Sequence, residues 1–270
     1  MHSTTPAASV AAIPCEHQDA LAGTPCGVCT VRGLSICAPL APEDMPYMAA
    51  IVSSRKLEAG EGLFVEGQPA EDLYNITAGT MMVYRLLPDG RRQVTGFLFP
   101  GDFLGLGSEA VYRYSAEAIT PATLCRFRRH ELQQALERFP AMEKRLFGMA
   151  GNELAAAQDQ MVLLGRKTAQ ERVATFLLML SRRAQRRGQK ANPIPVPMSR
   201  AQIGDYLGLT IETVSRAFSR LKAEGLIRPL VGNRIDILDP DRLAAMADGV
   251  QPGAAPTPRP RRGCAAAPHR

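Results

Sequence analysis

Two short amphipathic segments in the last third of the chain constrain its fold more than any other feature. Ser199 is a good N-cap for a helix that ends near Leu207, and Gly208 then begins a tight turn. Thr210 can cap a second helix over residues 211–224. The apolar side chains of this second helix recur at steps of four and three, as Val214, Phe218 and Leu221. Two capped helices joined by a glycine turn predict a helix-turn-helix.

The opposite face of the second helix is polar, and its chemistry suits the major groove of DNA. Arg216 can donate two hydrogen bonds to guanine, and Glu212 can accept one from cytosine. Since they lie one helical turn apart, Glu212 can also orient Arg216. Ser215 can bond a base edge or a phosphate, and Thr213 shares the polar face. Glu–Arg pairs at this spacing are common on ordinary helices, but within a helix-turn-helix they favour base reading of double-stranded DNA.

Charge is distributed unevenly along the chain. Residues 1–165 contain 13 Lys and Arg against 18 Asp and Glu, residues 166–247 contain 15 against 7, and residues 248–270 contain 4 against 1. A basic C-terminal third behind an acidic front indicates a polyanion-binding module joined to a domain with another role. Walker loops, HExxH sequences and nucleophile elbows are absent from the sequence, so no catalytic activity is expected.

Four cysteines form the second chemical feature. Cys26 and Cys29 are separated by two residues, Gly27 and Val28, and a third cysteine, Cys37, follows after a flexible loop. Cys125 lies in a β-like segment much further on. Thiolates are soft ligands that suit an iron–sulfur cluster or a zinc ion. Two alternatives stay open at this point: Cys26 and Cys29 as a redox dithiol, and Cys125 as a small buried hydrophobe.

The periodicity of the sequence divides the chain into five parts. Residues 1–47 form a cysteine-rich segment, 48–139 a domain of short antiparallel strands resembling a barrel or jelly roll, and 140–166 a single helix. Residues 167–247 comprise an entry helix, the helix-turn-helix and a two-stranded wing, and 248–270 form a disordered tail. Pro88-Asp89-Gly90-Arg91 predicts a hairpin turn within the strand domain, and Pro140 suits the first turn of the helix. The expected fold class is therefore α+β.

The single helix carries an apolar stripe at alternating steps of three and four, which predicts a seam for a partner helix. Its residues are Phe147, Ala150, Leu154, Ala157, Met161 and Leu164. Packing against its own domain is the alternative. No apolar run reaches the length of a membrane helix and the N-terminus lacks the features of a signal peptide, so a cytoplasmic location and no membrane partner are expected.

The whole layout resembles the CRP/FNR transcription regulators, and among them the oxygen-sensing FNR type. The segment Thr168–Ala174 is similar to the family's entry into its DNA-binding domain, and Ile203–Thr210 followed by Glu212–Arg216 is similar to its recognition motif. The resemblance covers residues 26–246. It implies a β-roll sensor domain, a long dimerisation helix, a winged helix-turn-helix, and a homodimer on an inverted-repeat DNA site, with RNA polymerase as a further partner.

The resemblance also implies roles for individual residues. Cys26, Cys29, Cys37 and Cys125 match the family's ligands to a [4Fe–4S] cluster, and Glu212, Ser215 and Arg216 match its base-reading positions. The resemblance further implies that such a cluster is held without oxygen, favours the DNA-binding dimer and is degraded by oxygen. Cys15 and His17 match no ligand position.

The sequence differs in two places from the patterns of related regulators, in the dimerisation helix and in the region of a cyclic-nucleotide site. Ala157 stands where the best-known members have an aspartate, and without that carboxylate pair the seam is wholly apolar, so dimerisation is expected to depend less strictly on the cluster. A cyclic-nucleotide site of the same fold would need a ribose-binding glutamate and an adjacent Arg–Ser/Thr pair. Here Tyr114 separates Arg113 from Ser115, so that anion site is eroded.

Overall fold

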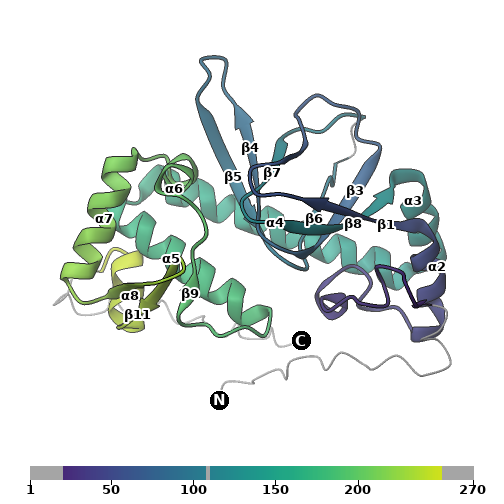
Figure 1. Cartoon of the computed structure of the whole chain (residues 1–270). Helices are drawn as coiled ribbons and strands as arrows, with labels where there is room; N and C mark the ends of the chain where they lie inside the picture. The colour runs from purple at the N-terminus through teal and green to yellow at the C-terminus, as the bar shows by residue number, and fades with distance from the viewer. Residues whose placement is uncertain (1–20, 108–109, 251–270) are drawn as a thin grey trace, which may run out of the picture.

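The computed structural model describes residues 21–107 and 110–250, so Cys15, His17, Glu109 and Cys264 lie outside the described residues. A β domain and a helical domain lie at opposite ends of a long helix (Figure 1). This is the α+β architecture expected from the sequence, with a β-roll first and a helix-turn-helix domain last.

The β domain consists of two four-stranded antiparallel sheets. One has the order β1–β8–β3–β6 and the other β2–β7–β4–β5. The strands are β1 Val52–Leu57, β2 Gly62–Phe64, β3 Asp72–Ala78, β4 Met81–Leu86, β5 Arg92–Leu98, β6 Phe103–Leu104, β7 Ser115–Ala118 and β8 Ala122–Arg128. A core that includes Ile76, Met81, Leu104 and Leu124 lies between the sheets. The predicted hairpin turn at residues 88–91 is confirmed, because Gly90 has a φ of +85° and its N–H donates to the Leu87 carbonyl.

The cysteine-rich segment packs on the outer face of the first sheet. It contains two 3-10 turns, Arg32–Leu34 and Pro42–Asp44, followed by helix α2, Met45–Ile51. A separate core forms where this segment meets β3, β8, helix α3 (Arg129–Arg138) and the start of helix α4. Its fully buried members include Leu21, Ile36, Met45, Met48, Leu132 and Met142.

Helix α4 spans Pro140–Arg166, with the proline in its first turn as expected. Near its N-terminal end Met142 is buried, and Arg145 donates a hydrogen bond to the Leu34 carbonyl at 2.8 Å. Near its C-terminal end Leu163 is buried against the helical domain. The helix is therefore anchored at both ends and otherwise largely exposed.

The helical domain follows the predicted order. Helix α5 (Ala169–Arg186) begins at a capping box formed by Thr168 and Glu171. The helix-turn-helix consists of α6 (Arg200–Leu207) and α7 (Ile211–Ala223), and the wing is formed by β10 (Ile227–Leu230) and β11 (Arg234–Ile237). Strand β9 (Ile194–Pro195), which the sequence did not indicate, adds a third strand to the wing, and helix α8 (Pro240–Ala247) completes the domain.

The two domains share one continuous apolar core. Phe97 of β5 packs against Phe176 of α5 and Tyr206 of α6, with ring centroids 6.0 and 5.0 Å away. Polar contacts surround these rings: Gln93 Nε2 donates to the Asp205 carbonyl at 2.7 Å, and Gln160 Nε2 donates to the Tyr206 carbonyl at 2.7 Å. Strand β5 and helix α4 therefore both hold α6, the first helix of the helix-turn-helix.

Candidate metal centre and nucleic-acid interface

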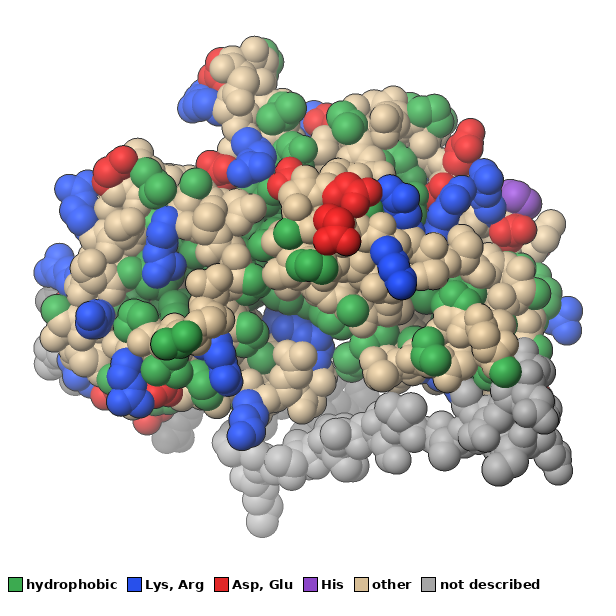
Figure 2. All heavy atoms as spheres, viewed as in Figure 1, with side chains coloured by type: hydrophobic (Ala, Val, Ile, Leu, Met, Phe, Trp, Pro, Cys, Tyr) green, Lys and Arg blue, Asp and Glu red, His purple; other side chains and the backbone are tan. Residues whose placement is uncertain are grey.

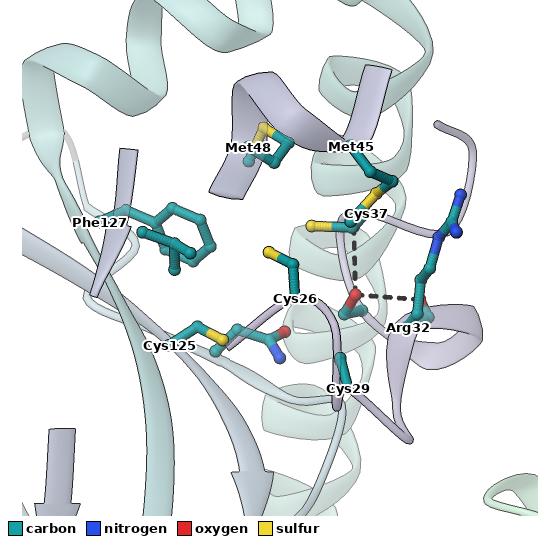
Figure 3. Close-up of a pocket in the computed structure, with 11 residues that line it drawn as sticks. Cys26, Cys29, Arg32, Cys37, Met45, Met48, Cys125 and Phe127 are labelled. Atoms are coloured by element: carbon teal, nitrogen blue, oxygen red, sulfur yellow. Dashed lines mark hydrogen bonds between the residues drawn. The ribbon is translucent and has the colours of Figure 1, made fainter. Parts of the chain in front are cut away.

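The four predicted cysteines line one pocket, although they come from distant parts of the chain. Cys26, Cys29 and Cys37 belong to the N-terminal segment, and Cys125 lies on β8 (Figure 3). In the close-up, the sulfur atoms of Cys26, Cys37 and Cys125 point toward the same space. The other lining residues are mainly apolar and include Met45, Met48, Val52 and Phe127; the polar ones are Arg32, Ser35 and Asn75.

Local hydrogen bonds hold the cysteine loop in shape. Ser35 Oγ accepts the Cys37 backbone N–H at 3.2 Å and donates to the Arg32 carbonyl at 2.9 Å. The Arg32 guanidinium in turn donates to the Leu40 carbonyl at 2.6 Å. Gly27 has a packing role as well, because a Cβ there would lie 2.4 Å from the Leu21 carbonyl oxygen. The loop is thus closed by its own side chains before any ligand binds.

Burial controls the electrostatics of the thiols. Burial first, and the neighbouring thiols after it, raise the pKa of Cys26 to about 11 and the pKa values of Cys37 and Cys125 to about 12. At neutral pH these cysteines are therefore protonated unless a cation compensates the thiolate charge. Metal binding would displace those protons.

The donor set fits a soft metal centre, but the thiols are not already gathered into one. Within residues 21–107 and 110–250, no group of three or more His, Cys, Asp or Glu side chains is arranged to hold a metal ion. The chemistry is nonetheless selective, since the pocket presents sulfur donors and no carboxylate. Sulfur-only donors suit iron–sulfur clusters and zinc rather than hard cations.

The polar face of α7 is open to solvent, with Glu212, Ser215 and Arg216 exposed and Thr213 half-buried. Thr210 Oγ1 caps the helix by accepting the Thr213 N–H at 3.3 Å. Arg216 Nη2 donates to Thr213 Oγ1 at 3.4 Å, so the orienting contact expected from Glu212 is supplied by Thr213 instead. Bonds from its own N–H and from Thr210 hold the pKa of Glu212 below its usual range, which keeps the carboxylate ionised as an acceptor.

Helix α7 lies on the outer side of the helical domain, away from the β domain (Figure 1). Lys and Arg side chains are spread over the same domain, at the left of the space-filling view (Figure 2). The polar helix face therefore projects from a basic surface, as contact with a polyanion requires.

The predicted seam on α4 is mostly open. Phe147 is 82% exposed, and Leu154 and Met161 are more than half exposed; Ala150 and Ala157 are exposed as well. Leu164 differs from the other five, because it is half-buried and packs against the core of the helical domain near Gly208. Five of the six predicted residues thus remain available to a partner, and the sixth is already in contact within its own chain.

Sequence reasoning did not identify Asn75 or Arg32 as pocket residues. Both are buried, and both have a polar side-chain atom without a hydrogen-bond partner in the described part of the chain. Asn75 carried a usable signal, since it is a polar residue inside the apolar strand Leu73-Tyr74-Asn75-Ile76. Arg32 carried none beyond its place in the cysteine loop.

A β-roll joined by a long exposed helix to a winged helix-turn-helix is the architecture of a DNA-binding regulator with a second, β-rich domain. Comparison with known proteins makes the class specific. Residues 54–139 match the profile of the cyclic nucleotide-binding domain, and residues 171–246 match that of the Crp-like helix-turn-helix domain.

The transcriptional activatory protein AadR of Rhodopseudomonas palustris is 42% identical over 219 residues, which cover 81% of this chain and 91% of that protein. The transcriptional activator protein Anr of Pseudomonas aeruginosa is 36% identical over 227 residues, covering 83% and 93%. The structure of FixK2 from Bradyrhizobium japonicum has 39% identity and a TM-score of 0.67, covering 76% of this chain and all of that one. The chain belongs to the CRP/FNR family of DNA-binding transcription regulators. These relatives are regulators by name, in agreement with the expected lack of catalytic activity.

Proposed function

We propose that this regulator is an oxygen- or redox-responsive transcription activator whose DNA binding depends on a [4Fe–4S] cluster held by Cys26, Cys29, Cys37 and Cys125. The observation that carries the proposal is that these four thiols, from two distant segments, line one otherwise largely apolar pocket. When bound, the cluster would supply an oxygen-labile link between the N-terminal loop and the β-roll.

The proposed signal reaches the dimer through α4. The cysteine loop and the start of α4 share a core, and Arg145 ties the helix directly to the Leu34 carbonyl. A loop that is ordered by the cluster would hold this end of α4 in one position and favour pairing of two copies through Phe147, Leu154 and Met161. Two paired chains would present two copies of α7, which matches an inverted-repeat site. As an activator, the dimer would then act with RNA polymerase.

The test begins with protein purified without air. Iron and acid-labile sulfide near four of each per chain, with visible absorbance that disappears in air, are expected for a [4Fe–4S] cluster. Binding to an inverted-repeat duplex and sedimentation are then compared before and after exposure to air, with a duplex carrying one half-site as control. Stoichiometric zinc without sulfide, or DNA affinity and dimerisation that are unchanged when the cluster is lost, would overturn the proposal.

Zinc is the second candidate occupant, because four thiolates also suit a structural zinc ion. The same elemental analysis distinguishes the two, and a zinc site would leave DNA binding insensitive to air.

The other sequence alternatives have less support. A reactive dithiol needs a lowered thiol pKa, whereas burial raises that of Cys26. In the cyclic-nucleotide region, Ser115 is buried and its Oγ accepts the Glu66 N–H at 3.0 Å. The ring of Tyr112 also stacks on Phe64 within the core between the sheets, with centroids 3.7 Å apart. Ser115 is therefore buried rather than presented to an incoming phosphate, and the Tyr112 ring is part of the packed core between the sheets.

A further inference from the structure

Asn75 is a buried polar residue on the apolar side of the sheet that faces the cysteines. It is only 3% exposed and lies in the middle of β3, which is an inner strand paired with β8 and β6. Side chains alternate along a strand, so Asn75 shares its face with Leu73. Leu73 and the neighbouring Phe103 and Phe127 all belong to the core beneath the cysteine loop. An apolar residue would be the ordinary choice at this position.

The amide of Asn75 does little for the fold. Its Nδ2 donates to the Ile76 carbonyl at 3.2 Å, but that carbonyl already accepts the Gly101 N–H at 2.8 Å. Within the described part of the chain, Asn75 Oδ1 is fully buried and has no hydrogen-bond partner. A buried polar side chain with unpaired atoms destabilises the fold. Asn75 Nδ2 carries two N–H groups and the Ile76 carbonyl uses only one of them, so the second N–H can donate to a partner that binds in the pocket.

The position of Asn75 identifies that partner. In the β3–β8 register Asn75 stands directly opposite Cys125, and both side chains line the cysteine pocket. Directly opposed residues of an antiparallel pair have adjacent side chains on one face. The second N–H of the Asn75 amide can therefore donate toward the sulfur atoms while the first keeps its bond to the Ile76 carbonyl.

We propose that Asn75 is a positioning residue for the cluster, donating an amide N–H to a sulfur atom at the Cys125 side of the pocket. This inference rests on the proposed iron–sulfur function. Hydrogen bonds to sulfur are among the factors that set the stability and potential of such clusters. Replacing a residue that supports metal ligands in this way typically costs about 10–100-fold in metal affinity.

The test uses the full chain, purified without air, in wild-type form and as Asn75→Leu and Asn75→Asp. Leucine removes the amide but keeps the branching and the number of heavy atoms, and aspartate keeps the shape but replaces the N–H donor with a negative charge. The measurements are cluster loss to an iron chelator, cluster loss in air, and the thermal midpoint of the cluster-free protein. Ser115→Ala is the matched control, because Ser115 is an equally buried polar residue that does not line the pocket.

Asn75→Leu should destabilise the cluster-bound form and stabilise the cluster-free form. Asn75→Leu should lose its cluster about tenfold faster than wild type, while its cluster-free form melts at a higher temperature because the unpaired amide is gone. Asn75→Asp should lose its cluster faster still, since a carboxylate repels thiolates. Asn75→Ser keeps a donor and should retain the cluster better than leucine, and it also serves if the larger change prevents folding.

Each outcome separates this inference from the function on which it rests. Equal rates of cluster loss in wild type, Asn75→Leu and Asn75→Ser would overturn the role of Asn75. The proposal that the protein holds a cluster would still stand. Destabilisation of both the cluster-bound and cluster-free forms by leucine would instead assign Asn75 a structural role and overturn the inference. A wild-type protein that binds no iron and sulfide would overturn the proposed function itself.

Discussion

The polar face of α7 and the cysteine pocket are the two chemically distinctive regions of this regulator, and they are built in different ways. The α7 face comes from one continuous segment, its helix is capped within that segment by Thr210, and its side chains are exposed. The pocket joins the N-terminal loop to β8, and Cys26 and Cys125 in it are buried. A site made from neighbours in sequence persists whenever its helix forms, whereas a site closed across the fold depends on everything that brings the segments together.

The strongest test of this difference is the removal of one thiol. Cys125→Ser should abolish the visible iron–sulfur absorbance of protein prepared without air, and Cys26→Ser, Cys29→Ser and Cys37→Ser should do the same, because each removes one of four ligands. Absorbance and iron analysis are the measurements. Cys15→Ser and Cys264→Ser are the controls and should keep full absorbance. A complete cluster in Cys125→Ser would show that the pocket is not the metal site.

Substitutions on the polar face of α7 should change DNA recognition and leave the cysteine pocket unaffected. Arg216→Ala and Glu212→Ala should each reduce discrimination between correct and incorrect bases by about 1–3 kcal/mol, because each removes a contact to a base edge. Affinities for a matched duplex and for single-base variants measure this effect.

The control for the base-reading variants is Arg220→Ala, further along the same helix and already paired with Glu224. It should weaken binding to all sequences alike and reduce the salt dependence. Wild-type base preference in both Arg216→Ala and Glu212→Ala would contradict the base-reading assignment.

Helix α4 connects the two regions, and Ala157 tests that connection. Two helices paired through the exposed stripe would bring both copies of residue 157 together, so Ala157→Asp places like charges in a partly dry seam. We expect the cluster-free protein to dimerise about tenfold more weakly, equivalent to about 1.4 kcal/mol, and to depend more on the cluster. Sedimentation of both forms measures the change.

Ala155→Asp is a matched control for Ala157→Asp, since Ala155 is exposed on α4 but is not part of the stripe. An unchanged balance between monomer and dimer in Ala157→Asp would show that residue 157 does not lie in the dimer seam.

The smallest predicted effect is the pH-dependent contribution to stability of Asp102, at the contact between the β domain and the helical domain. Asp102 is half-buried, with its carboxylate 3.4 Å from the Arg183 guanidinium and with Arg187 and Glu153 nearby. Burial raises the pKa of Asp102 despite both arginines, so the folded protein holds this proton more tightly than the unfolded chain. The contribution of Asp102 to stability therefore falls as the pH rises from the usual range for aspartate through the raised pKa.

Asp102→Asn removes this titration, so the melting temperature of wild type relative to the variant should fall with rising pH, by about 2–4 °C or less. Melting curves between pH 4 and 7 measure the difference. A difference that grows with pH would show that the ion pair with Arg183 outweighs burial.

Local sequence was enough to predict the helix-turn-helix with its caps at Ser199 and Thr210. It was also enough for the hairpin turn at residues 88–91 and for helix α4 beginning at Pro140. In each case, hydrogen bonds and apolar periodicity within a few residues specify the structure. The exposure of Phe147 and Leu154 also agrees with the stripe read from the sequence.

Contacts between distant segments required the folded chain. The pairing of Asn75 with Cys125, the contact of β5 with α6 and the half-burial of Leu164 have no signature in local sequence. They arise when the sheets, the cysteine loop and the helices pack together, because this packing determines which side chains from distant segments come into contact. The sequence alone therefore indicated which residues are candidates for the chemistry, and tertiary packing decided which of them meet.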